Sequence, residues 1–135
     1  MRNAELKYTS YSGDTVMTDF VDEMKKRTKQ FALRVIRVVQ SLENDKVANV
    51  LGTQLLRSGT SVGANYRAAC RARSSAEFRA KLGIVEEECD ESSYWMELLV
   101  EAGLVAEKRL SELLQEADEI LAVVVTSINT SKRNK

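Results

Sequence analysis

The chain has no proline in 135 residues, and its apolar residues recur at helical spacing from residue 18 to residue 129. Proline is the strongest interrupter of helices, and a β-rich fold needs many turns built from glycine and proline. The chain also has only six glycines, so it lacks the residues that such turns require. The sequence therefore predicts an all-α protein made of long helices.

Four amphipathic segments carry this pattern, with apolar residues three, four or seven positions apart. We expect helices at about 18–42, 46–73, 74–102 and 107–129. The connections are short, so successive helices should be antiparallel neighbours in an up-down four-helix bundle. The length suits one domain. We expect a flexible N-terminal arm at 1–17, the bundle at 18–131 and a basic C-terminal tail at 132–135.

The second segment contains a row of glycines beside its apolar stripe, formed by Gly52, Gly59 and Gly63. A glycine inside a helix costs about 1 kcal/mol relative to alanine, so three of them at helical spacing need a packing reason. Such a row allows another backbone to approach closely. We therefore predict a helix-packing or oligomer motif that consists of Ser58, Gly59, Ser61, Gly63, Asn65, Tyr66 and Trp95.

Three side chains of this motif have individual expected roles. Asn65 should hydrogen-bond across helices and fix their register, as buried amides do in coiled coils. Tyr66 should bury its ring and keep its hydroxyl bonded. Trp95 is expected in the core or an interface, with a base-stacking platform as the alternative.

The charges are divided between the two halves of the chain. Residues 24–81 carry 13 Lys and Arg against three acidic residues, whereas residues 82–131 carry two against 12. A basic surface attracts polyanions, and the forked donors of arginine match phosphate geometry. The candidate nucleic-acid-binding residues are Arg34, Arg37, Arg57, Arg67, Arg71, Arg73 and Lys81. The alternative is that they pair with acids of the third helix, within a subunit or between subunits.

The absence of histidine removes the commonest general base and the commonest metal ligand. Cys70 and Cys89 form no zinc-binding pattern, and we expect both as buried thiols in a reducing cytoplasm. No apolar run approaches the roughly 18 residues of a membrane span. The sequence therefore predicts a cytoplasmic protein that is not an enzyme, holds no metal or cofactor and has no membrane partner.

Three runs of sequence resemble a bacterial four-helix-bundle family. The most specific is LLRSGTSVGANYRAA at 55–69, and the others lie at 74–82 and 87–95. That family was first noticed as open reading frames inside intervening sequences of large-subunit ribosomal RNA genes. The resemblance covers about residues 18–130.

The resemblance implies an antiparallel four-helix bundle that assembles as a ring-shaped homo-oligomer, a homopentamer in members of the family, with no established enzymatic activity. Related bundles are accessory subunits of diversity-generating retroelements, where they bind a reverse transcriptase and its RNA through a basic surface. We therefore predict a non-enzymatic oligomer that binds nucleic acid, in the first place RNA, with a reverse transcriptase as a candidate partner. The alternative is a structural or protein-interaction ring that binds no nucleic acid.

Overall fold

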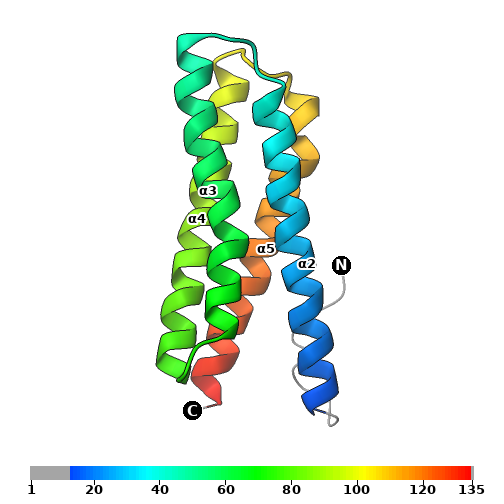
Figure 1. Ribbon diagram of the computed structural model, residues 1–135, viewed down its shortest axis with the longest axis vertical. Helices are drawn as coiled ribbons and strands as arrows, with labels where there is room; N and C mark the ends of the chain where they lie inside the picture. Colours follow the sequence, from blue (N-terminus) through cyan, green and yellow to red (C-terminus); the bar gives the residue numbers. More distant parts are fainter. Residues whose placement is uncertain (1–12, 135) are drawn as a thin grey trace.

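The computed structural model describes residues 13–134, which form four helices and no strand. The helices are α2 (Gly13–Gln40), α3 (Lys46–Cys70), α4 (Ser75–Glu101) and α5 (Glu107–Arg133). They run alternately up and down alongside one another (Figure 1). The contact of α3 with α4 is the most extensive, whereas α2 and α5 touch only lightly. The predicted all-α four-helix bundle is confirmed for this part of the chain.

Both outer ends of the bundle extend further than predicted. Helix α2 begins at Gly13, so the last five residues of the predicted arm are helical, and residues 1–12 lie outside the described residues. Helix α5 continues through Arg133, so Lys132 and Arg133 form its last turn instead of a tail. No glycine or proline interrupts the chain there, and positive charge is favourable at a helix C-terminus.

Helix α3 ends at Cys70, three residues before the predicted end, because the turn to α4 needs those residues. Arg71 leaves helical geometry while its N–H still bonds to the preceding turn. Ser74 is extended and caps α4 by accepting a hydrogen bond from the Glu77 N–H at 3.0 Å. The Glu77 carboxylate accepts in turn from the Arg73 N–H at 2.6 Å. These two hydrogen bonds fix the backbone geometry of the turn between α3 and α4.

The glycine row of α3 faces α2 of the same chain. A Cβ placed on Gly59 would lie 2.8 Å from both methyl groups of Val35, and one on Gly63 would lie 3.2 Å from Thr28 Oγ1. Real Cβ atoms do not come that close, so only glycine allows the two helices their observed separation at Gly59. The helix that approaches the row therefore belongs to the bundle itself.

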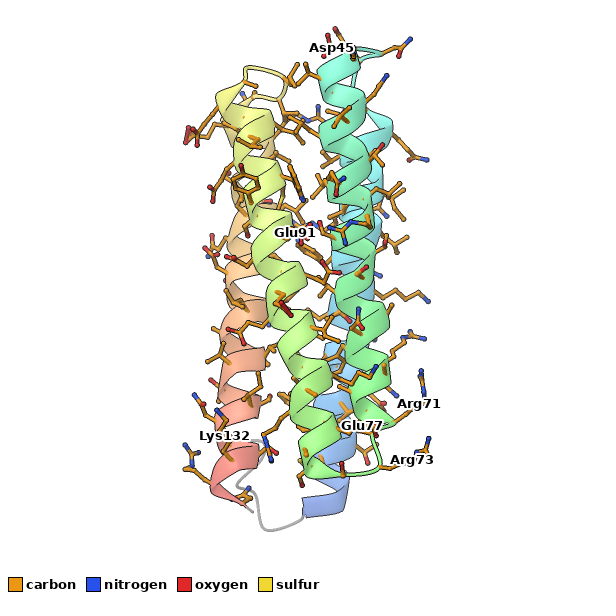
Figure 2. The ribbon with its side chains drawn as sticks, turned by 90° about the vertical axis from the view of Figure 1, so that its left-hand side faces the viewer. Asp45, Arg71, Arg73, Glu77, Glu91 and Lys132 are labelled. Carbon is orange, nitrogen blue, oxygen red and sulfur yellow. The ribbon has the colours of Figure 1, made fainter. Side chains whose placement is uncertain are left out.

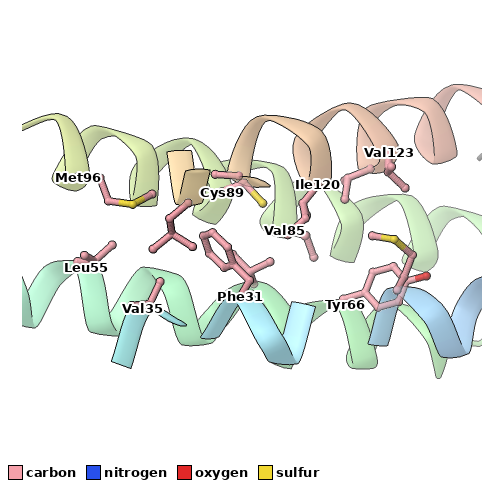
Figure 3. Close-up of a cluster of buried hydrophobic side chains, with 14 of the residues drawn as sticks. Phe31, Val35, Leu55, Tyr66, Val85, Cys89, Met96, Ile120 and Val123 are labelled. Carbon is pink, nitrogen blue, oxygen red and sulfur yellow. The ribbon is translucent and has the colours of Figure 1, made fainter. Parts of the chain in front are cut away.

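The core runs the length of the bundle and includes one pair of hydroxyl groups. Figure 3 shows Phe31, Leu55 and Met96 among the buried side chains that fill it. The Ser92 hydroxyl donates to Ser58 Oγ at 3.0 Å and joins α4 to α3, and both side chains are fully buried. Ser58 is also 3.3 Å from the Leu55 carbonyl oxygen of its own helix. Two small polar residues therefore let α3 and α4 pack tightly with no unsatisfied group between them.

Gly59→Ala should lower the free energy of unfolding by about 1–3 kcal/mol, because the added methyl group overlaps Val35. Helix propensity alone would favour alanine by about 1 kcal/mol, so a net loss identifies crowding. The matched control is Gly83→Ala in α4, where nothing lies within 4 Å of an added Cβ and stability should rise. Urea unfolding followed by circular dichroism measures both variants. A gain in stability for both variants would contradict the close approach of α2 and α3.

Candidate nucleic-acid interface

The seven basic candidates do not form one continuous surface. Arg34 and Arg37 lie in the last two turns of α2. Arg71 and Arg73 lie in the turn after α3, toward the opposite end of the bundle, where Figure 2 shows them projecting outward. Since α2 and α3 are antiparallel, the end of one is the start of the other. The candidates are therefore separated along the long axis of the molecule.

Arg57 pairs with acids of α4. Its Nη1 atom lies 3.3 Å from Glu88 Oε2, and its Nη2 atom contacts Glu91 Oε1. For this arginine, pairing with the third predicted helix within one chain is what the structure shows. The Arg57 side chain is about half exposed, so the pair contributes at most about 1 kcal/mol.

The other six candidates form no ion pair with an Asp or Glu among the described residues. Four of them are exposed and two, Arg34 and Lys81, are half-buried. Their charges are thus not neutralised by a carboxylate within the described part of the chain. They are available to another molecule, whether a polyanion or a second copy of the chain.

A second set of ion pairs between helices involves Arg27, which the sequence analysis did not single out. Its Nε and Nη2 atoms donate to both oxygens of Glu116 at 2.6 and 2.8 Å, and Nη2 also reaches Glu119 at 2.7 Å. Hydrogen bonding to Glu116 raises the pKa of Arg27, although burial opposes this. These bonds join α2 to α5, which make fewer contacts than the other neighbouring pairs of helices. The signal in the sequence was the position of Arg27 between Met24 and Phe31 of the apolar stripe.

A groove of about 480 Å³ opens at the end of the bundle where α3 gives way to α4. Lys25 and Arg73 line it, and its apolar lining comes from three helices, with Met17, Val21, Ala69, Cys70 and Phe78 among its residues. Arg71 and Lys25 both lie close enough to the Cys70 thiol to lower its pKa. We call Lys25, Arg71 and Arg73 the basic rim. Of the original candidates, the structure thus gathers Arg71 and Arg73, and it adds Lys25.

The two cysteines differ in environment. Burial raises the pKa of the Cys70 thiol, and a hydrogen bond with Tyr66 and the charges of Lys25 and Arg71 oppose this shift. Burial, followed by the neighbouring acid Glu88, raises the pKa of Cys89 to about 12. Cys89 is buried as predicted, but Cys70 is only half-buried because it lines the groove. Both are protonated at neutral pH, so neither is an activated nucleophile.

Two polar residues of the predicted helix-packing or oligomer motif form hydrogen bonds within α3. Asn65 was expected to bond across helices, but its amide nitrogen donates to the Ser61 carbonyl oxygen at 2.9 Å. The reason is its place on the flank of α3, where it is half-buried. Ser61 donates to the Arg57 carbonyl oxygen at 2.7 Å. Tyr66 is buried in the core.

Trp95 lies half-buried on α4. Its indole nitrogen is 3.4 Å from Glu91 Oε1, and its ring meets Tyr94 edge-on with centroids 5.1 Å apart. Glu91 is also the partner of Arg57, so Trp95 borders the ion pair between α3 and α4. Lys81 is likewise half-buried on α4, two turns after the N-cap.

Within the part of the chain that the structure describes, no group of three His, Cys, Asp or Glu side chains is arranged to hold a metal ion. Of the acids of α4, two contact Arg57 of α3 and three line a groove shared with α5, namely Glu88 and Glu91 in the first group and Glu86, Glu87 and Asp90 in the second. In that same part, no helix has the length and apolar character needed to cross a bilayer.

Residues 22–126 match the model of a protein family described as 23S rRNA-intervening sequence protein. The chain belongs to this family. The glycine row, the Ser58–Ser92 contact and the basic rim all lie in the matched region. Among curated proteins none matches this chain.

A solved structure has the same fold. It is the crystal structure of a protein of unknown function from the S23 ribosomal protein family of Bacteroides thetaiotaomicron, which is 33% identical to this chain. The match covers 81% of this chain and 97% of the other, with a TM-score of 0.76. The family match and the similarity to this solved structure therefore support the same four-helix fold.

Iodoacetamide should alkylate Cys70 in the folded protein and leave Cys89 unmodified, because Cys70 lines a groove whereas Cys89 is buried in the core. The thiolate is the reactive form of cysteine, and the pKa of Cys70 is raised. The rate of alkylation of Cys70 should therefore rise about tenfold for each pH unit from pH 7 to pH 9. Peptide mass spectrometry measures both sites, and unfolding in urea, which should expose Cys89, is the control. Equal reactivity of the two thiols in the folded protein would contradict the described packing.

Proposed function

We propose that the protein is a non-enzymatic, oligomeric RNA-binding protein that holds the phosphate backbone of RNA at the basic rim. The observation that carries this proposal is the gathering of Lys25, Arg71 and Arg73 at one end of the bundle, with no carboxylate ion-paired to them among the described residues. Like charges held close together repel, and a bound polyanion removes that repulsion. Arginine in particular forms paired hydrogen bonds to phosphate.

The contacts available at the rim set the kind of recognition. Lysine and arginine contacts to phosphate position a nucleic acid without reading its sequence. Binding at the rim should therefore be strongly salt-dependent and only weakly sequence-specific. The choice of RNA over DNA rests on the resemblance to proteins encoded within ribosomal RNA genes and to RNA-binding retroelement subunits.

Self-association, as the ring-shaped homopentamer that the resemblance implies, is the second part of the proposal. The large apolar side chains left exposed in the described part all lie on α3 and α4, at Val47, Val50, Leu56, Ile84 and Tyr94. Apolar side chains concentrated on two adjacent helices favour a protein interface. An oligomer would repeat the basic rim in every subunit and so bind a long polyanion by several weak contacts. RNA held in this way could be presented to a partner such as a reverse transcriptase.

One observation favours the alternative of a ring that binds no nucleic acid. Arg57, a member of the original candidate set, is already paired with Glu88 and Glu91. If the remaining candidates meet the exposed acids of a neighbouring subunit in the same way, no free basic surface is left. The experiment below separates the two cases.

The proposal predicts that Arg71→Glu/Arg73→Glu abolishes RNA binding without dissociating the oligomer. Fluorescence anisotropy of a labelled oligoribonucleotide across a salt series measures affinity, and light scattering measures mass. If two phosphate contacts are lost, the slope of log affinity against log salt should fall in magnitude by about 1.4. The matched control is Lys46→Glu/Lys108→Glu, which makes the same change in charge at exposed positions at the other end of the bundle.

The control should bind RNA within about twofold of the wild-type protein at 150 mM salt, because screening limits the reach of charge to about 8 Å. Equal losses in both variants would show that net charge, and not the rim, attracts RNA. Dissociation of the Arg71/Arg73 variant would place these arginines in a subunit interface. A monomeric mass for the wild-type protein would contradict the oligomer.

A further inference from the structure

The groove beside the basic rim differs in its lining from two other grooves of the described region. Its lining is mainly apolar, and the charged side chains that contribute to it, Lys25 and Arg73, are both cationic. The groove at the opposite end is lined by Glu43 and Asp45 as well as Arg109. A third, on α4 and α5, is lined by Glu86, Glu87 and Asp90. Of these three grooves, the first is the one whose lining suits a ligand that is apolar in one part and anionic in another.

From this juxtaposition we infer that the groove binds one unpaired nucleobase of the RNA, while the flanking phosphates lie on Lys25, Arg71 and Arg73. This inference rests on the proposed function and adds a preference for single-stranded over double-stranded RNA. A base has two apolar faces and a polar edge, and its phosphates lie within one nucleotide of it. The apolar groove matches the faces of the base, and the cationic rim matches the phosphates.

The lining of the groove suits the shape and chemistry of a base. Phe78 of α4 and Met17 and Val21 of α2 offer apolar surface from two sides. The hydroxyl groups of Ser74 and Ser75 line the same groove and can meet the polar edge of a base. Ser74 Oγ accepts from the Glu77 N–H as the cap of α4, and this leaves its own proton free to donate. A volume of about 480 Å³ lies in the range of small-molecule sites.

Glu77, which precedes the groove residue Phe78, does not block this site. The carboxylate of Glu77 accepts a hydrogen bond from the Arg73 backbone N–H, which directs it into the turn between α3 and α4. Glu77 is not among the residues that line the groove. The side chain of Arg73 remains exposed and projects from the end of the bundle (Figure 2).

Base pairing decides which RNA can enter such a groove. In a duplex both faces of each base are covered by stacking, and the base edges are paired. A single strand, a bulge or a loop presents bases that can be turned outward. The rim alone should hold either form by its phosphates, and the groove should add affinity only for the unpaired form.

Cys70 supplies a reporter inside the groove, and the buried Cys89 serves as its internal standard. The wild-type protein is treated with iodoacetamide alone, with a single-stranded 12-nucleotide RNA, with a duplex of the same length and with inorganic polyphosphate. Each is supplied at a concentration that anisotropy or competition shows to be saturating. Any polyanion on the rim offsets the charges of Lys25 and Arg71 that lower the pKa of Cys70, so all three ligands should slow its alkylation somewhat. We expect the single strand to slow alkylation about tenfold more than the duplex or polyphosphate, because only a base stacked in the groove also covers the thiol.

A variant tests the same point by affinity. Met17→Ser removes apolar surface from the groove without changing the charge. It should weaken single-stranded binding to the level of the duplex and leave duplex binding unchanged, with circular dichroism to check the fold. If this variant fails to fold, the alkylation experiment on the wild-type protein still decides.

The possible failures can be told apart. Binding of single strand, duplex and polyphosphate with equal affinity and equal protection of Cys70 overturns the base-binding groove but leaves RNA binding at the rim intact. No binding of any of them overturns the proposed function and this inference with it. Protection of Cys70 before RNA is added, relieved by deletion of residues 1–12, would show that the N-terminal segment occupies the groove and would also overturn the inference.

Discussion

The contact between Val35 of α2 and Gly59 of α3 sets the geometry on which the rest of this bundle depends. It fixes the separation of the two helices at a distance that no side chain on α3 would allow. It also fixes their register, since Gly52 meets Leu42 and Gly63 meets Thr28 in the same antiparallel sequence. Continued to the C-terminal end of α3, this register brings Lys25 beside Cys70 and the start of the turn to α4. The basic rim and its groove are thus a consequence of the glycine row.

The charged residues divide into those that hold the bundle together and those that do not. Arg27 joins α2 to α5 through Glu116 and Glu119, where the two helices make few contacts, and Arg57 joins α3 to α4 through Glu88 and Glu91. The rim lies beyond the reach of these acids because the acids of α4 and α5 mostly begin a turn or more from the end of the bundle. Some of the basic residues of the sequence therefore form ion pairs inside the bundle, and others remain without such a pair at one end of it. This division is what makes one protein surface a candidate for RNA.

The helical periodicity was enough to predict the fold and the apolar core, because helix packing depends on patterns that recur over many residues. The fate of individual polar groups could not be predicted in the same way. Asn65 bonds within its own helix, and Arg27 forms the bonds that close the bundle, because each depends on a rotation of a few tens of degrees about a helix axis. The groove could not be foreseen at all, since Met17, Cys70 and Phe78 come together only through the tertiary arrangement. Helix ends depended on local turn geometry, which composition does not specify.

The most direct test of this account is a double-mutant cycle on the contact between α2 and α3, with oligomeric mass measured for each variant. Val35→Ala removes the methyl groups that an alanine at position 59 would strike, so the loss of stability in Gly59→Ala/Val35→Ala should be smaller than the sum of the two single losses. A coupling of about 1 kcal/mol or more, with mass unchanged, is the predicted result. Additive losses within about 0.5 kcal/mol, or a change of mass caused by Gly59→Ala, would contradict the account, because the glycine row would then serve a contact between subunits and not within one.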